Sequence, residues 1–278
     1  MTNSTSIQWL VITDLDGTLL NHHSYAVDKA LPALKRLEEE NIPVIFNTSK
    51  TAAESITLQN ELNIQSPFIV ENGSAIYLPK SLITDMPEKA ESFDQYWVVM
   101  LGQNQQTIRQ ILKQLDTNDN SYQLLSDCTV QQAIDLTGLT EEQAQQAISR
   151  EYSEPLIWRS NDEALAIFKQ QLAEHNLHTL QGGRFLHVLG NTDKGKACRS
   201  LKPYFGSPLN TVKTIILGDS ANDAAMLEMA DISVIVNSPS NHTLEQLIKP
   251  TIKTDNQAPQ GWAEGIEKAL IKIEQNEV

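Results

Sequence analysis

The sequence predicts an α/β fold, a parallel sheet with helices on both faces that carries an inserted second α/β domain. Short apolar runs typical of strands alternate with helical periods up to about residue 80, and the same alternation returns after about residue 190. These runs are continuously apolar, as expected for strands covered on both faces. The stretch between them has a different pattern, so we expect a core of residues 1–80 and 191–278 and an insertion of residues 81–190.

The core elements follow the strand, helix, strand order that builds a doubly wound sheet. The expected strands are Trp9–Thr13, Pro43–Asn47, Phe68–Glu71, Val212–Leu217 and Ile232–Val236. The expected helices are about Asp28–Glu40, Ala52–Leu62, Lys194–Tyr204, Asn222–Met229 and Trp262–Gln275. The insertion adds a strand at Tyr96–Leu101, an amphipathic helix near Gln105–Leu115 and a Gln-rich helix around Glu141–Glu151. Thr140 and Gln143 stand in capping-box spacing at the start of that last helix.

Composition argues against several classes of protein. The 278 residues include 21 Lys and Arg against 35 Asp and Glu, a formal net charge of −14 that repels nucleic-acid phosphates. No apolar run approaches the roughly 20 residues that cross a bilayer, and the first residues lack the pattern of a signal peptide. Cys128 and Cys198 have no metal-ligand spacing. We therefore expect a cytoplasmic protein that acts on a small molecule, with neither nucleic acid nor a membrane as partner.

Polar residues follow directly after the expected core strands. Parallel sheets bind ligands outside the carboxyl ends of their strands, so these residues could face one crevice. They are Asp14-Leu15-Asp16, Thr48-Ser49-Lys50, Glu71-Asn72-Gly73 and Gly218-Asp219-Ser220. This crevice is the predicted functional site.

Carboxylates dominate the predicted crevice. Asp14, Asp16 and Asp219 would repel one another unless a cation lies between them, and an all-oxygen site with few protein ligands suits Mg²⁺. Taken alone, Asp14 and Asp16 could be turn formers, with Gly17 supplying a positive φ, and Asp223 could belong to a helix cap. The two acidic clusters together favour a metal site over both alternatives.

Four stretches resemble the signature motifs of the haloacid dehalogenase superfamily of phosphotransferases. They are VITDLDGTLL (11–20), NTSKT (47–51), DKGKA (193–197) and GDSANDAAML (218–227), in the order in which that superfamily carries them. The resemblance implies a Rossmann-like α/β core. The Asp-x-Asp-Gly-Thr form of the first motif is that of the phosphatases of the superfamily.

The same resemblance implies a role for each motif residue. Asp14 would attack phosphorus and form an aspartyl-phosphate, and Asp16 would protonate the leaving alkoxide and then deprotonate the hydrolytic water. Mg²⁺ would be held by Asp14, the backbone carbonyl of Asp16, and Asp219. Lys194 would neutralise charge on the nucleophile and the phosphoryl oxygens, and Asp223 would support the water shell of the metal or orient Lys194.

The insertion resembles the C2-type cap of sugar phosphatases, and three stretches resemble mannosyl-3-phosphoglycerate phosphatases. These are ENGSAIY (71–77), DLTGLTEEQAQQAISREYSEPLIW (135–158) and GGRFLHVLGNTDKGKA (182–197). The implied substrate is a glycosyl-3-phosphoglycerate, and the implied products are phosphate and a glycosylglycerate, which is a compatible solute. Another sugar-phosphate phosphatase, a phosphomannomutase-like phosphotransferase and a non-catalytic sugar-phosphate sensor remain as alternatives.

The remaining candidates would bind the substrate. Thr48 is implied as a hydrogen-bond donor to the phosphoryl group and Ser49 as a further donor, although both could instead cap the following helix. Arg184 could pair with the glycerate carboxylate, or it could be a surface charge, and Lys50 could also reach into the crevice. At the cap hinge, substrate hydrogen bonds and a plain turn are both open for the pair Asn72-Gly73.

Overall fold

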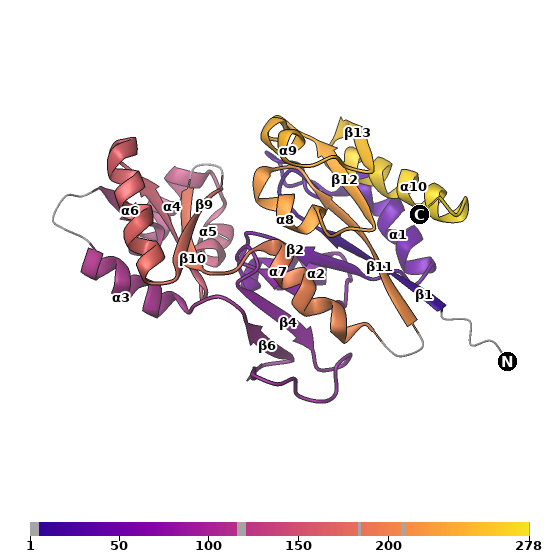
Figure 1. Ribbon diagram of the computed structural model, residues 1–278, viewed down its shortest axis with the longest axis horizontal. Coiled ribbons are helices and arrows are strands. Elements are labelled where there is room, and N and C mark those ends of the chain that lie inside the picture. Colours follow the sequence, from indigo (N-terminus) through magenta and orange to yellow (C-terminus); the bar gives the residue numbers. More distant parts are fainter. Residues whose placement is uncertain (1–5, 116–120, 183–184, 207–209, 278) are drawn as a thin grey trace.

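The computed structural model describes residues 6–115, 121–182, 185–206 and 210–277. These residues form two lobes, a larger one around a nine-stranded sheet and a smaller one around a four-stranded sheet (Figure 1). The predicted α/β class is therefore confirmed. No helix in the described ranges is both long and apolar enough to span a membrane.

The larger sheet has the strand order β13-β12-β11-β1-β2-β3-β4-β6-β5. Its parallel part consists of β1 (Ser6–Thr13), β2 (Val44–Asn47), β3 (Phe68–Val70), β11 (Asn210–Gly218), β12 (Ile232–Asn237) and β13 (Ile252–Gln257). One face is covered by α1 (Leu31–Glu39), α2 (Ala52–Glu61) and α10 (Gln260–Glu274). The other face is covered by α7 (Lys194–Leu201), α8 (Ala224–Leu227) and α9 (Asn241–Leu247). Burial on both faces explains why the central strands read as continuous apolar runs.

Three antiparallel strands extend the larger sheet beyond β3. They are β4 (Ala75–Pro79), β5 (Ala90–Phe93) and β6 (Tyr96–Met100). The expected insertion began at residue 81, but β5 and β6 belong to this sheet, so that boundary divides a set of paired strands. The backbone groups of β4 pair with β6 from Ala75 opposite Met100 to Pro79 opposite Tyr96. Without β6, β4 would be an edge strand with unpaired backbone groups, which explains why β6 belongs to the larger sheet.

The smaller lobe has an antiparallel sheet in the order β7-β8-β10-β9. Its strands are β7 (Tyr122–Leu124), β8 (Ser153–Trp158), β9 (Leu177–Gly182) and β10 (Phe185–Gly190). Two helices pack on this sheet through a common apolar cluster, α3 (Gln105–Leu115) and α6 (Asp162–Glu174). Two further helices, α4 (Val130–Thr137) and α5 (Glu141–Ile148), form a second apolar cluster. The capping box predicted for Thr140 and Gln143 is present at the start of α5.

The chain crosses between the lobes along two adjacent segments. A side chain at Gly190 would place its Cβ 2.7 Å from the backbone nitrogen of Gln103, so only glycine allows the two segments to lie this close. The backbone nitrogens of Leu101 and Gly102 both donate to the carbonyl of Ser74, which attaches the outgoing segment to the larger lobe. The ends of the smaller lobe therefore lie side by side, next to the loop between β3 and β4.

Candidate active site

The carboxyl ends of β1 and β11 bring two aspartates together. The strands are parallel neighbours, with Thr13 opposite Leu217, and the backbone nitrogen of Asp14 donates to the carbonyl of Leu217. Asp14 and Asp219 therefore leave the sheet at the same level, and both are buried. This juxtaposition depends on strand order, because the paired residues Thr13 and Leu217 are far apart in the sequence.

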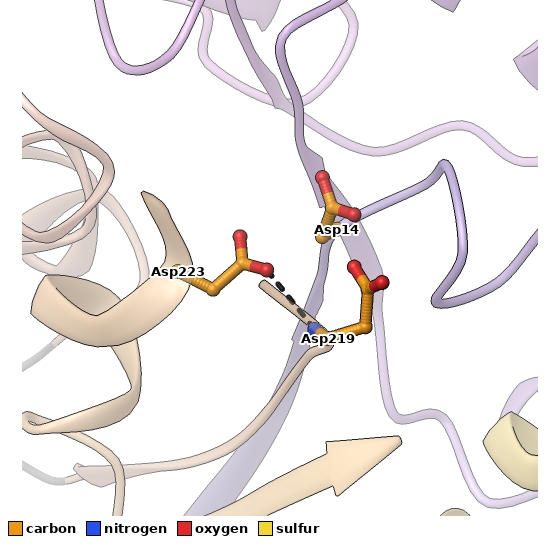
Figure 2. Close-up of side chains that lie close together, drawn as sticks. All are labelled: Asp14, Asp219 and Asp223. Atoms are coloured by element: carbon orange, nitrogen blue, oxygen red, sulfur yellow. Dashed lines mark hydrogen bonds between the residues drawn. The ribbon is translucent and has the colours of Figure 1, made fainter. Parts of the chain in front are cut away.

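A third carboxylate completes an acidic cluster. Asp14, Asp219 and Asp223 each offer an oxygen within 4.8 Å of the others, and Figure 2 shows the three groups converging. Both oxygens of Asp223 have partners: one accepts from Lys194, and the other accepts from the backbone nitrogens of Asp219 and Ser220 at 3.0 and 3.1 Å. Asp223 is thus a support for its neighbours, and the freer oxygens belong to Asp14 and Asp219.

Lys194 is the cation within this cluster. Its Nζ lies 2.6 Å from Asp14 Oδ1 and 2.6 Å from Asp223 Oδ1, and its side chain is 1% exposed. Burial by itself would lower the pKa of Lys194, but the two carboxylates outweigh that effect and raise the pKa above its usual value. Asp193 caps the first turn of α7 by accepting from the backbone nitrogen of Lys196, which places Lys194 at the start of the helix.

The donor set fits a divalent cation. With all three carboxylates ionised, the single ammonium would leave two negative charges without compensation. Burial first, and then the carboxylates of Asp14 and Asp223, raise the pKa of Asp219 to about 8. The hydroxyl of Thr18 lies 3.2 Å from both Asp14 Oδ2 and Asp219 Oδ1, and its single proton can serve one of them at a time. A hard cation between Asp14 and Asp219 would relieve this repulsion.

Gly17 makes room for this arrangement. Its φ is +84°, and a Cβ added there would lie 2.6 Å from Asp219 Oδ2. Both the left-handed backbone and the approach of the carboxylate exclude a side chain. Gly17 therefore does more than permit a turn, because it also admits Asp219 next to the first motif.

Asp16 lies apart from the acidic cluster. Its Oδ2 is 3.1 Å from Lys50 Nζ, and its Oδ1 is buried without a hydrogen-bond partner in the described part of the chain. Lys50 Nζ also lies 3.3 Å from Glu54 Oε1 and 4.9 Å from the centre of the Tyr25 ring. One oxygen of the Asp16 carboxyl group is therefore held by Lys50, and the other has no partner among the described residues.

The loop after β2 places Thr48 at the same end of the sheet. The backbone nitrogen of Lys50 donates to Thr48 Oγ1 at 3.1 Å, so the hydroxyl proton of Thr48 remains available for another acceptor. Thr51 caps α2, and its capping box with Glu54 is complete. The alternative in which Thr48 or Ser49 caps this helix is therefore wrong.

The hinge residues lie against the third and fourth motifs. Asn72 has a φ of +59°, and its Oδ1 accepts from Asn222 Nδ2 at 3.2 Å. Gly73 has a φ of +91°, and a Cβ there would lie 2.3 Å from the carbonyl oxygen of Asp193, so the backbones are in direct contact. Gly73 thus packs the hinge against the start of α7. Arg184, the candidate for the substrate carboxylate, lies outside the described residues.

A family model matches most of the chain. The model describes haloacid dehalogenase-like hydrolases, and it covers residues 11–261, which include all four motifs. The chain belongs to this family. Four residues of these motifs, Asp14, Lys194, Asp219 and Asp223, lie together in the acidic cluster described above.

Two curated relatives are similar over nearly their full lengths. A glucosyl-3-phosphoglycerate/mannosyl-3-phosphoglycerate phosphatase of Persephonella marina is 33% identical over 268 residues, which is 95% of this chain and 98% of the relative. A protein of the same name from Methanococcoides burtonii is 35% identical over 260 residues, 92% of this chain and 95% of the relative. This haloacid dehalogenase-like hydrolase is accordingly a phosphatase.

Solved structures share the fold. A phosphatase of the same superfamily from Bacteroides thetaiotaomicron superposes with a TM-score of 0.68 at 18% identity, covering 96% of this chain and 97% of the other. The sucrose-phosphatase of Synechocystis, solved with sucrose and phosphate, gives a TM-score of 0.61 at 16% identity, with coverage of 96% and 98%. At these identities the likeness concerns the two-lobed architecture.

Sequence reasoning missed several residues that support the site of this haloacid dehalogenase-like hydrolase. Thr18 bridges Asp14 and Asp219, and Asn47 Nδ2 donates to the carbonyl of Lys194 at 3.0 Å. Both stand inside the first two motifs, so the motifs contained the signal. Glu71 and Arg150 meet across the two lobes, and no local pattern in the sequence indicates that contact.

Proposed function

We propose that this phosphatase hydrolyses a glycosyl-3-phosphoglycerate, with a mannosyl or glucosyl group, to the glycosylglycerate and phosphate. The reaction class follows from the family, and the substrate is supported by the printed names of the two relatives and by their nearly complete coverage. The observation that carries the chemistry is the buried contact of Asp14 with Lys194, beside Asp219, in a cluster that fits a divalent cation.

Asp14 is the proposed nucleophile. Lys194 donates to one of its oxygens at 2.6 Å and so fixes the orientation of the carboxylate. Attack forms a bond from Asp14 to phosphorus and breaks the bond from phosphorus to the glycerate oxygen. Lys194 and the hydroxyl of Thr48 then stabilise negative charge on the phosphoryl oxygens. Water hydrolyses the aspartyl-phosphate, which releases phosphate and restores Asp14.

Asp16 is the proposed acid and base. Its unpartnered Oδ1 is free to carry the proton that the leaving glycerate oxygen needs. In the second step the same carboxylate accepts a proton from the attacking water. Two carboxylates are required because one bonds to phosphorus while the other moves protons.

Mg²⁺ is the proposed cofactor. Asp14, Asp219 and the backbone carbonyl of Asp16 would hold it, with Asp223 as a support. When bound, the cation offsets the repulsion between the Asp14 carboxylate and the phosphoryl oxygens.

Substrate recognition is proposed for the smaller lobe and the hinge. Because β5 and β6 pair with the larger sheet, we place the cap at residues 101–190 and the catalytic core in the rest of the chain. Thr48 and Ser49 would contact the phosphoryl group, while Lys50 and Arg184 would supply positive charge for the glycerate carboxylate. The hinge pair Asn72-Gly73, which contacts Asn222 and Asp193, would also bind the substrate.

Phosphate release tests the proposal. The purified protein is assayed with Mg²⁺ and with EDTA on mannosyl- and glucosyl-3-phosphoglycerate, 3-phosphoglycerate, mannose 6-phosphate, sucrose 6-phosphate and p-nitrophenyl phosphate. We expect a Mg²⁺-dependent preference in kcat/KM for a glycosyl-3-phosphoglycerate, and no turnover by Asp14→Asn, which retains the fold. Equal, poor activity on every ester would refute the substrate, and normal activity of Asp14→Asn would refute the mechanism.

A further inference from the structure

Arg150 crosses from the smaller lobe into the larger one. It follows α5, its side chain is 8% exposed, and its Nη1 donates to the backbone carbonyl of Ser49 at 3.0 Å. The same nitrogen lies 3.2 Å from Ser153 Oγ and 3.8 Å from Glu71 Oε2. A residue of the cap therefore holds the backbone of the loop that carries Thr48.

The contact bears on Thr48 through one peptide unit. The carbonyl of Ser49 and the nitrogen of Lys50 belong to the same planar group, so fixing the carbonyl also fixes the direction of the N–H. That N–H donates to Thr48 Oγ1 at 3.1 Å and occupies an acceptor site of the hydroxyl. The proton of Thr48 is then left to donate to a phosphoryl oxygen.

We infer that Arg150 is a positioning residue of the cap, which orients the Thr48 hydroxyl for phosphoryl transfer through the peptide between Ser49 and Lys50. The inference rests on the proposed role of Thr48 in binding the phosphoryl group. Docking of the cap thus completes this part of the catalytic site, and this role is separate from any contribution of the cap to substrate recognition.

Glu71 holds the cap segment in the required place. This core residue is 1% exposed and stands at a φ of +49°. Its carboxylate accepts from the backbone nitrogens of Glu151 and Tyr152 at 2.9 and 3.3 Å and from Ser153 Oγ at 2.5 Å. The segment that begins with Arg150 is thus bound along its length by one carboxylate of the core.

The cost of burying Arg150 argues against a role in packing alone. Its Nε is buried without a hydrogen-bond partner among the described residues, and such an unpaired group is destabilising. Replacing a buried ion pair by apolar side chains is often neutral or favourable for stability. Retaining a guanidinium here is understandable if the carbonyl of Ser49 must be held in one orientation.

A double-mutant cycle on glucosyl-3-phosphoglycerate tests the inference, with kcat, KM and the melting temperature measured for each protein. We expect Arg150→Gln to lower kcat by about 10- to 100-fold, as for other groups that orient a catalytic residue. Arg150→Lys should recover part of kcat, because it keeps a donor but lacks the planar fork. Once Thr48→Val has removed the hydroxyl, either substitution at Arg150 should change kcat by less than about twofold.

Arg109→Gln is the matched control. Arg109 lies on α3 of the cap, and the partners described for it, Ser126 and Asp127, belong to the cap as well. This variant should keep the wild-type kcat. Should Arg150→Gln fail to fold, the cycle is run with Arg150→Lys, for which we expect a measurable loss of kcat that disappears in the Thr48→Val background.

A second substrate separates positioning from direct recognition. p-Nitrophenyl phosphate has neither a sugar nor a carboxylate, so a loss of kcat on it cannot come from contacts to those groups. We expect Arg150→Gln to lower kcat on both substrates. Loss on the glycosyl substrate alone, additive effects in the cycle, or an unchanged kcat would overturn the inference. Absence of phosphate release by the wild-type protein would instead overturn the proposed function.

Discussion

Replacing Lys194 by methionine tests how much the two buried ion pairs of Lys194 contribute to the free energy of unfolding. The side chain is 1% exposed, and its Nζ lies 2.6 Å from a carboxylate oxygen of both Asp14 and Asp223. Methionine fills a similar volume but leaves these carboxylates without the ammonium. Removing one partner of a buried ion pair costs about 3–5 kcal/mol, so Lys194→Met should lose that much free energy of unfolding in EDTA.

The matched control is Lys196→Met, two residues further along α7. Lys196 is 44% exposed, and its Nζ is 3.7 Å from Asp193 Oδ2. A solvated pair of this kind contributes little, so Lys196→Met should stay within about 0.5 kcal/mol of the wild type. Both variants are unfolded with urea in EDTA, and the free energies of unfolding are compared.

Mg²⁺ provides an internal check on the same variant. Without the ammonium, the cluster carries one more uncompensated negative charge, so a divalent cation should bind the folded state more tightly and recover more stability than in the wild type. Activity should still fall by about 10²- to 10³-fold, because the phosphoryl oxygens lose a fixed cation. Equal unfolding midpoints for Lys194→Met and Lys196→Met in EDTA would refute the reasoning.

Three further predictions follow from contacts elsewhere. Asp16→Asn should strongly suppress kcat on glucosyl-3-phosphoglycerate, since the leaving oxygen goes unprotonated; near wild-type turnover would contradict this. Gly17→Ala should raise the Mg²⁺ concentration for half-maximal activity, because the new Cβ meets Asp219 Oδ2 at 2.6 Å; an unchanged titration would contradict the fit. Burial raises the pKa of Glu264, but hydrogen bonds from Lys268 and from the backbone of Asp255 and Asn256 outweigh this effect and lower the pKa to about 2. Because the folded pKa lies below the unfolded value, this stabilisation is present above pH ~4.3 and is lost as the pH falls toward 2. Glu264→Gln should therefore have a lower free energy of unfolding than the wild type at neutral pH, and the difference should shrink as the pH falls. A difference that grows on acidification would contradict the lowered pKa of Glu264.

The fold was largely predictable where strands are buried on both faces. Helices cover both faces of β1, β2, β11 and β12, so the sequences of these strands are continuously apolar and predict strands clearly. β13 was not predicted, because it is an edge strand with the polar sequence IKTDNQ. β6 was recognised as a strand but assigned to the insertion, since its local sequence does not reveal that β4 is its partner.

The residues of the candidate site also differ in how far the sequence predicts them. Asp14, Asp16, Thr48 and Asp219 follow parallel strands, and the rule that parallel strands end at one edge predicts that they lie at the same end of the sheet. Lys194 follows no strand of that sheet, and its role was implied only by the resemblance to a known family. The contact between Glu71 and Arg150 was not predictable, because it joins residues from two lobes. Neither periodicity nor spacing encodes such a pairing.

The sequence by itself determined the fold class and predicted a gathering of carboxylates after the strands, because these depend on local apolar runs and on residue types at fixed spacing. The phosphatase form of the first motif was implied by its resemblance to a known family. Tertiary structure decided which strands share a sheet, that Asp223 holds Lys194, and that a cap arginine reaches the Thr48 loop. These features depend on how distant segments pack and compete for hydrogen bonds, which only the folded chain settles.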